Sequence, residues 1–185
     1  MKVLAVSGYR HYELGIFSEK HLGIAYIKKA IEQRLREFLD EGLEWVVISG
    51  QTGVEMWCAD VVFSLQEEFP HLKLSMLQPF LQQEERYNEM HKMKYEEIML
   101  LADHVDAITK RPYETPYQLR MKNDFIVQHT DALLILYDEE KEGTPKFIVK
   151  SGQQKDGYSI FYITSYDLQA IVEEEMMNNS HFFES

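Results

Sequence analysis

The chain has 185 residues, of which 45% are apolar, so it fits one domain with a sizeable core, because domains usually contain roughly 100 to 200 residues. Thirty-one acidic side chains against 19 basic ones give a formal net charge of -12, whose field repels nucleic-acid backbones, so nucleic acid is not expected as a partner. Cys58 is the only cysteine, which excludes an intramolecular disulfide and a cysteine-based metal cluster and suits a reducing interior.

The amino-terminal apolar run is too short for a signal peptide, whose hydrophobic region needs about 7 to 15 residues, and it predicts a strand instead. Nowhere does the sequence approach the roughly 18 consecutive apolar residues that would favour a membrane span. We therefore expect a cytoplasmic protein with no membrane insertion.

Short apolar runs alternate with segments of helical periodicity along the chain. The predicted strands are residues 3–7, 45–49, 73–77, 105–109, 132–137 and 160–164. This alternation predicts an α/β fold with a mostly parallel sheet and helices on both faces.

Apolar residues at intervals of three or four predict the helices between these strands. In chain order, the faces are Ile24, Ile27, Ile31, Leu35 and Phe38 before Gly42; Val54, Trp57, Cys58, Val61, Leu65 and Phe69 before Pro70; Tyr87, His91, Tyr95, Ile98 and Leu101; and Tyr117, Met121 and Phe125 after Pro116. A last helix is predicted for residues 166–177, and the polar residues after it predict a frayed tail at 179–185.

The loop after the second predicted strand carries the sharpest ligand signal, Ser49-Gly50-Gln51-Thr52-Gly53-Val54-Glu55. Its glycines let backbone N–H groups approach an anion, and the helix start adds unpaired donors, so we expect these amides to face an open cavity that takes a phosphate. The same residues also satisfy a capping box, in which Thr52 and Glu55 tie off the helix without a ligand. Both interpretations stay open, because the loop matches neither the dinucleotide fingerprint nor the P-loop.

Two further loops reach the same edge of the predicted sheet, where ligands bind at the point of strand-order reversal. Gly8, Tyr9 and Arg10 follow the first strand and offer a flexible glycine, a stacking ring and a cation for phosphate. Gly143 and Thr144 follow the fifth strand and combine a turn glycine with a hydroxyl. The alternatives are a covered sheet edge for the first loop and a charged surface turn for the other.

Cations gather around the fourth predicted helix in an otherwise acidic chain, at Arg111, Arg120 and Lys122. They could neutralise a ligand, although a solvated helix face is the favoured interpretation for Lys122. Asn123 is harder to assign to such a face, because asparagine is a mediocre helix residue, and it is included among the candidate ligand-binding residues.

Other reactive side chains give no pattern of a metal or catalytic site. The seven histidines lack the paired spacing of zinc ligands, so no metal site is expected. Cys58 falls on the apolar stripe of its helix, which indicates an inert core residue rather than a nucleophile.

Four separated blocks of the sequence, at residues 6–10, 48–57, 111–114 and 136–146, resemble the YpsA family in content and order. The resemblance extends from Met1 to about Glu175. This family is similar to the superfamily that includes the DNA-processing protein DprA and the LOG phosphoribohydrolases, which are Rossmann-like domains that hold nucleotides or nucleotide-derived ligands.

The resemblance implies a Rossmann-like three-layer fold and a pocket for a nucleotide or ADP-ribose-like ligand. The pocket residues it implies are Gly8, Arg10, Gly50, Gly53, Glu55, Gly143 and Thr144. It also implies a link to bacterial cell division, with division proteins as candidate partners. The chain departs from the LOG signature Pro-Gly-Gly-x-Gly-Thr-x-x-Glu, because no glutamate stands three residues after Thr144, and this disfavours an enzyme.

The leading hypothesis is therefore a nucleotide-binding regulatory domain over residues 1–178, in which Glu55 contacts the sugar or base of a small-molecule nucleotide. One alternative is an N-glycosidic hydrolase acting on nucleoside phosphates, with Glu55 as base or oxocarbenium stabiliser. Another is a protein-interaction scaffold whose function lies on an exposed patch. No cofactor is certain, and a homodimer is left open because no residue supports it.

Overall fold

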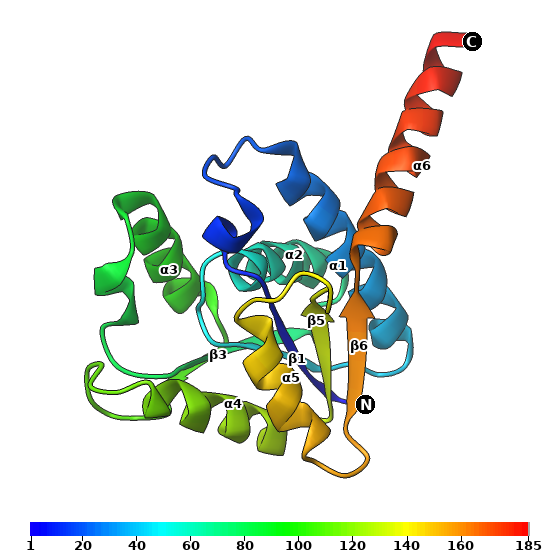
Figure 1. Ribbon diagram of the computed structural model, residues 1–185. Helices are drawn as coiled ribbons and strands as arrows, with labels where there is room; N and C mark the ends of the chain where they lie inside the picture. The colour runs from blue at the N-terminus through cyan, green and yellow to red at the C-terminus, as the bar shows by residue number, and fades with distance from the viewer. Residues whose placement is uncertain (185) are drawn as a thin grey trace.

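The computed structural model describes residues 1–184, with side chains as far as His181. Six strands form one fully parallel sheet in the order β4-β3-β2-β1-β5-β6 (Figure 1). The strands are β1 (Val3–Gly8), β2 (Trp45–Ile48), β3 (Lys73–Gln78), β4 (His104–Ala107), β5 (Ala132–Leu136) and β6 (Ser159–Ile163). All six predicted strands are confirmed, and their ends lie within about two residues of the predicted ones.

Helices cover both faces of this sheet, as the sequence predicts. The helices are α1 (Leu22–Asp40), α2 (Val54–Glu68), α3 (Glu89–Leu101), α4 (Tyr117–His129), α5 (Pro145–Gln153) and α6 (Ser165–Glu184), with short 3-10 helices η1 (His11–Leu14) and η2 (Gln83–Arg86). Figure 1 shows α1 and α2 on one face and α4 and α5 on the other. The fold is therefore a Rossmann-like three-layer sandwich.

The strand order reverses between β1 and β5. The chain steps outward from β1 to β4 and then crosses back to β5, whose Leu136 pairs with Gly8 at the carboxyl end of β1. In an open parallel sheet, the crevice at such a point is where ligands bind. The structure thus places the loops after β2, β1 and β5 side by side.

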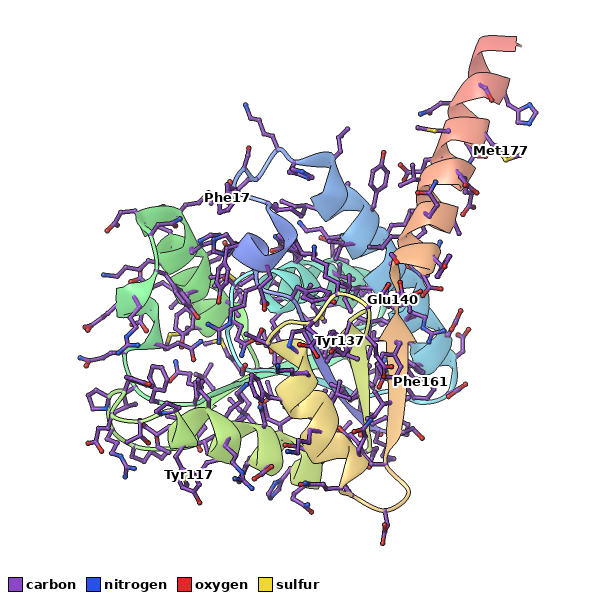
Figure 2. All side chains as sticks on the ribbon, in the orientation of Figure 1. Phe17, Tyr117, Tyr137, Glu140, Phe161 and Met177 are labelled. Atoms are coloured by element: carbon purple, nitrogen blue, oxygen red, sulfur yellow. The ribbon has the colours of Figure 1, made fainter. Side chains whose placement is uncertain are left out.

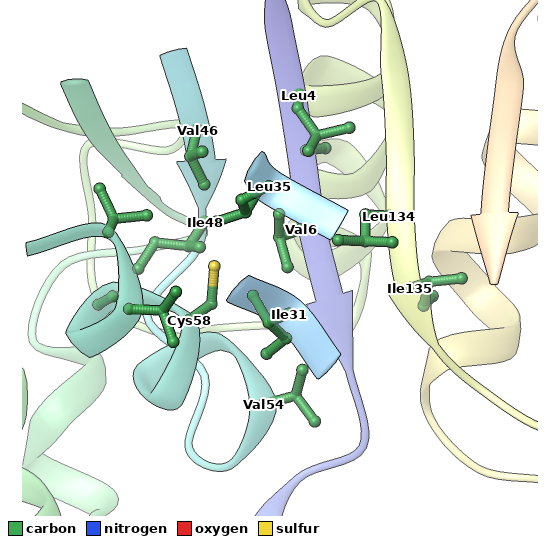
Figure 3. Packing of buried hydrophobic residues seen from close by; sticks show 14 of the residues in the cluster. Leu4, Val6, Ile31, Leu35, Val46, Ile48, Val54, Cys58, Leu134 and Ile135 are labelled. Carbon is green, nitrogen blue, oxygen red and sulfur yellow. The ribbon is translucent and has the colours of Figure 1, made fainter. Parts of the chain in front are cut away.

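The core lies on both faces of β1, β2 and β5, which is why these strands are continuous apolar runs. Figure 3 shows Val6 and Ile48 of the sheet packed with Ile31 of α1 and Cys58 of α2. Burial raises the pKa of the Cys58 thiol. The prediction that Cys58 is a core residue is confirmed, and its inertness stays a prediction.

Helix α4 is present where the sequence predicts it, but the predicted buried face is wrong. Tyr117 and Phe125 are exposed, and Figure 2 shows Tyr117 pointing away from the sheet. The buried face of α4 consists of Gln118, Lys122, Asn123, Ile126 and Val127. The apolar periodicity misled because three of these five buried residues are polar.

Two other helices differ from the prediction. Helix α5 is not predicted by the sequence interpretation, which treats residues 138–146 as a loop that either binds a ligand or forms a charged surface turn. Pro145 nevertheless occupies the first turn of this helix, and Ile148 and Val149 are buried. Helix α6 extends to Glu184, through residues at which a frayed tail is predicted, and Figure 1 shows it leaving the body of the domain. Within residues 1–184, no helix is long and apolar enough to cross a membrane.

Candidate functional site

The start of α2 is closed by protein rather than open. The N–H of Val54 donates to the carbonyl oxygen of Tyr9 over 3.2 Å. Gly53 has φ +85°, and a Cβ there would lie 2.6 Å from both Tyr9 O and His11 N. The loop after β1 therefore packs against the helix start, so the N–H of Val54 is engaged by the chain itself and Gly53 does not line the larger cavities beside this loop.

The predicted capping box is also wrong. The residue that precedes the first turn of α2 is Gly53, with no side-chain cap. Thr52 instead bonds through Oγ1 to Nδ1 of His11, at 2.7 Å. Its hydroxyl thus ties η1 to the loop after β2 rather than capping the helix.

Glu55 points into the protein and holds the loop after β2. Only 2% of the surface of Glu55 is exposed. Oε2 accepts from the backbone N–H groups of Ser49 and Gln51, each at 3.0 Å. Oε1 accepts from the hydroxyl of Ser7 at 2.9 Å, and the hydroxyl of Ser49 reaches both oxygens. This carboxylate organises the ends of β1 and β2, and its oxygens are already occupied.

Several other predicted residues also support the loops from within. A Cβ on Gly8 would lie 2.8 Å from Val54, and one on Gly50 would lie 2.6 Å from the ring of Tyr95. The buried Tyr9 donates its hydroxyl to the carbonyl oxygens of the loop after β5, and a Cβ on Gly143 would meet the ring of Tyr9 at 3.0 Å. At the three glycine positions, neighbouring segments approach so closely that a larger side chain would not fit.

A cavity of about 460 Å³ opens beside this packing, between the loops after β1 and β2 and the helices α4 and α5. We call it the cation-lined cavity. Its charged lining residues are Arg10, Arg120, Lys122, Asp124 and Lys150. Four cations against one carboxylate is the reverse of the balance in the whole chain, which has 31 acidic and 19 basic side chains.

Lys122 is the central cation of this cavity. Only 2% of the residue is exposed, and burial lowers the pKa of its amine to about 8, with Arg10 acting in the same direction and Glu55 against it. Among the side chains described, Lys122 makes no hydrogen bond or ion pair. The interpretation of Lys122 as part of a solvated face is wrong, and a desolvated amine beside a cavity is typical of functional sites.

Arg10, Asn123 and Thr144 line the same cavity. The Nε of Arg10 and Oδ1 of Asn123 are buried and have no partner among the described residues. Thr144 is already engaged, because its N–H and hydroxyl donate to Glu13 at 2.7 and 2.8 Å. Arg10 and Asn123 therefore present unpartnered polar side-chain atoms at this edge, whereas Thr144 does not.

A neighbouring cavity of about 430 Å³, which we call the aromatic cavity, lies over the ends of β1 to β4. It includes the predicted Arg10, Gln51 and Thr52 together with the rings of Phe80, Tyr87 and Tyr113. Arg10 and Gln51 line both cavities. Gly53 lines neither of these cavities, but a smaller one of about 280 Å³ with Trp57 and His91.

The structure thus divides the predicted residues into two groups. Arg10, Gln51, Thr52, Asn123 and Thr144 line the two larger cavities, and Gly53 lines the smaller one. The other residues, Gly8, Gly50, Gly143, Tyr9 and Glu55, shape the loops. The sequence interpretation missed Ser7, Glu13 and the aromatic residues after β3. The polar spacing of Gln118, Lys122 and Asn123 gave no signal of burial, because the same spacing is typical of a solvated helix face.

A fully parallel sheet with a cation-lined cavity at its strand-order reversal defines this protein as a Rossmann-like α/β domain. The family model YpsA, described as the YspA SLOG family, matches residues 4–168, and the chain belongs to this family. The resemblance stated from the four sequence blocks is confirmed.

The similarity to related proteins covers almost the whole chain. A UPF0398 protein of Bacillus cereus strain B4264 is 52% identical over 183 residues, covering 97% of this chain and 100% of its own length. A UPF0398 protein of Bacillus thuringiensis strain Al Hakam has the same identity and coverage. A solved structure of DNA processing protein A from Helicobacter pylori matches with a TM-score of 0.53 and 14% identity, covering 96% of this chain and 81% of that one.

The Helicobacter protein corrects one expectation. It has a single-stranded DNA binding mode, so a chain of this fold does bind nucleic acid. The exclusion of nucleic acid from the net charge of -12 was therefore wrong. Net charge sums the whole surface, whereas binding depends on local cations, and here the cations converge at one cavity.

Proposed function

We propose that this protein binds the phosphate of a nucleotide or nucleotide derivative in the cation-lined cavity, as a regulatory binding domain. One observation carries the proposal: Arg10 and Lys122 converge there, and neither has an ion-pair partner among the described side chains. Two unpaired cations at a desolvated site are costly without an anion. A phosphate supplies the missing charge and accepts from both groups.

The chemistry of the site divides between these side chains. The guanidinium of Arg10 suits bidentate contact with phosphate oxygens, and the ammonium of Lys122 acts as a compact point charge. A bound phosphate favours the charged amine and so raises the pKa of Lys122 from about 8. Asn123 offers an amide to the sugar or phosphate, while Thr144 stays with Glu13.

The hydrolase alternative has less support. A general base must reach the bond that it attacks, but Glu55 is 2% exposed and accepts hydrogen bonds from three residues of its own chain. We therefore assign Glu55 to positioning the loops. Binding of single-stranded DNA is a second candidate, favoured by the fold shared with the Helicobacter protein, because a free nucleotide and a DNA strand present the same phosphate.

Isothermal calorimetry tests the proposal with AMP, ADP-ribose, NAD, cyclic and guanine nucleotides and a short oligothymidylate. We expect at least one to bind, and Lys122→Met to weaken its affinity at least about tenfold, or 1.4 kcal/mol. Lys146→Met is the matched control, because Lys146 lies on the same face of the sheet but outside the cavity. Heat from none of these ligands, or equal affinity in Lys122→Met, contradicts the proposal.

The cellular location, the domain boundary and the biological role of the protein stay predictions. A cytoplasmic location, one domain over residues 1–178 and a role in cell division all rest on the sequence interpretation or on the family resemblance. The oligothymidylate arm bears on the DNA candidate directly: its binding in wild type and loss in Lys122→Met would extend the proposed ligand from free nucleotides to a strand.

A further inference from the structure

The aromatic cavity and the cation-lined cavity meet at the same edge of the sheet. They share Arg10, Gln51 and Leu119 in their walls. Their volumes of about 430 and 460 Å³ each fall within the roughly 300 to 1,000 Å³ that is usual for small-molecule sites. A ligand longer than one phosphate can therefore lie across both, with Arg10 at the junction.

The walls of the aromatic cavity suit a flat, uncharged ring. Phe80 and Tyr113 lie with ring centroids 5.2 Å apart, and the guanidinium of Arg86 lies 4.1 Å from the ring centroid of Tyr113. Its lining residues include two arginines and two histidines but no carboxylate. Aromatic faces with nearby guanidinium groups are the surfaces on which nucleobases stack.

Polar groups of this cavity are held in place before any ligand arrives. The hydroxyl of Tyr87 donates to the carbonyl oxygen of Gly50 at 2.9 Å, and Nε2 of Gln83 donates to Tyr87 at 2.8 Å. Gln83 is 5% exposed, and its Oε1 has no partner within the described part of the chain. A buried acceptor without a donor at the wall of a cavity is unusual in a structural role alone.

We propose that the aromatic cavity is the nucleobase subsite, so that the base of the bound nucleotide stacks on Tyr113. Its phosphate then lies at Arg10 and Lys122, in the cation-lined cavity. This inference rests on the proposed phosphate site. It adds the orientation in which the nucleotide binds, and it names the residues of a second cavity as the ones that contact the base.

The test compares a probe that has a base with one that lacks it. ADP-ribose and ribose 5-phosphate are titrated by calorimetry into wild type, Tyr113→Ala, Lys122→Met and the control Tyr117→Ala, whose ring is 62% exposed on the outer face of α4. We expect Tyr113→Ala to weaken ADP-ribose about tenfold, as for the loss of one stacked base, and to leave ribose 5-phosphate unchanged. Tyr117→Ala should match wild type for both probes.

The outcomes separate this inference from the proposed phosphate site. Unchanged ADP-ribose affinity in Tyr113→Ala, with a loss in Lys122→Met, overturns the base subsite and leaves the phosphate site standing. An equal loss of both probes in Tyr113→Ala also overturns it, because the ring would then act on the phosphate or on the fold. Absence of ADP-ribose binding in wild type overturns the base subsite as this experiment tests it, whereas the phosphate site falls only if every ligand of the first calorimetric test also fails to bind. A dinucleotide, pTpT, added as a third probe shows whether the source of the base is a DNA strand.

Discussion

Replacing Lys122 with methionine should stabilise the folded protein at pH 7 while it removes phosphate binding. The two side chains have similar length, but methionine carries no charge to bury. Lys122 is 2% exposed and has no ion-pair partner among the described side chains, so its charged form is costly in the fold. A residue retained at such a cost is expected where a ligand supplies the missing charge.

The size of the effect follows from the pKa of the amine. It falls from 10.5 in a free lysine to about 8 in the fold, a value that already includes the attraction of Glu55. Each pH unit between the two pKa values corresponds to about 1.36 kcal/mol, so the charged form costs about 3 kcal/mol at pH 7. For a domain of this size, about 3 kcal/mol raises Tm by about 6 to 12 °C.

The effect also has a defined pH dependence. Because the folded pKa lies below the unfolded one, the unfolded chain binds the proton more tightly, and wild-type stability rises with pH between about 8 and 10.5. Methionine has no such titration. The advantage of the variant should therefore shrink from about 3 kcal/mol at pH 7 to less than about 1 kcal/mol at pH 10.

Urea unfolding of wild type, Lys122→Met and Lys146→Met at pH 7 and pH 10 measures these differences. Lys146 is an exposed lysine with one surface ion pair, so its replacement should change stability by less than about 1 kcal/mol at either pH. A destabilised Lys122→Met at pH 7 would refute the reasoning, because it would mean that the amine is paired and contributes to the fold.

Three further predictions concern the loops. Gly53→Ala should lower the free energy of unfolding in urea by about 1 to 3 kcal/mol, because Gly53 has φ +85° and the new Cβ would lie 2.6 Å from backbone atoms. Unchanged stability would contradict this close approach. Glu55→Gln should lower the free energy of unfolding by about 1.5 to 3 kcal/mol, because the charge-assisted hydrogen bonds of the carboxylate are lost. Unchanged stability would argue against a structural role for this carboxylate. Burial lowers the pKa of His11 and His91, so stability is complete above about pH 6.5 and falls as pH drops below it; a smaller fall in His91→Gln checks the assignment.

The arrangement of the sheet was predictable because parallel strands are buried on both faces. Runs such as residues 132–136 are apolar throughout and end at polar residues, so their existence and ends are clear in the sequence. Helix α5 was missed for the opposite reason: its nine residues show only a short apolar stripe, behind the charged residues 138–142. The face of α4 was misassigned because Gln118 and Lys122 are buried there.

The functional site was only partly predictable, since its residues converge from distant segments. Arg10, Gln51, Asn123 and Thr144 were candidates and do line cavities. The importance of Lys122 depends on burial, which periodicity assigned to the wrong face of α4. The aromatic cavity joins residues after four different strands, and no local spacing indicates such a meeting.

The glycine-rich loops illustrate how a correct chemical interpretation can assign the wrong occupant. Their amides were predicted to hold an anion, and they do hold anions, but these are carboxylates of the chain itself. Glu55 accepts from the N–H groups of Ser49 and Gln51, and Glu13 accepts from those of Arg10 and Thr144. These four donors are satisfied internally, and the proposed phosphate site therefore rests on side-chain cations. Among the described cations of this cavity, Arg10, Lys122 and Lys150 have no ion pair, and of these three Lys122 alone is buried, which is why the proposed phosphate site lies at the cavity between α4 and α5 and not at the start of α2.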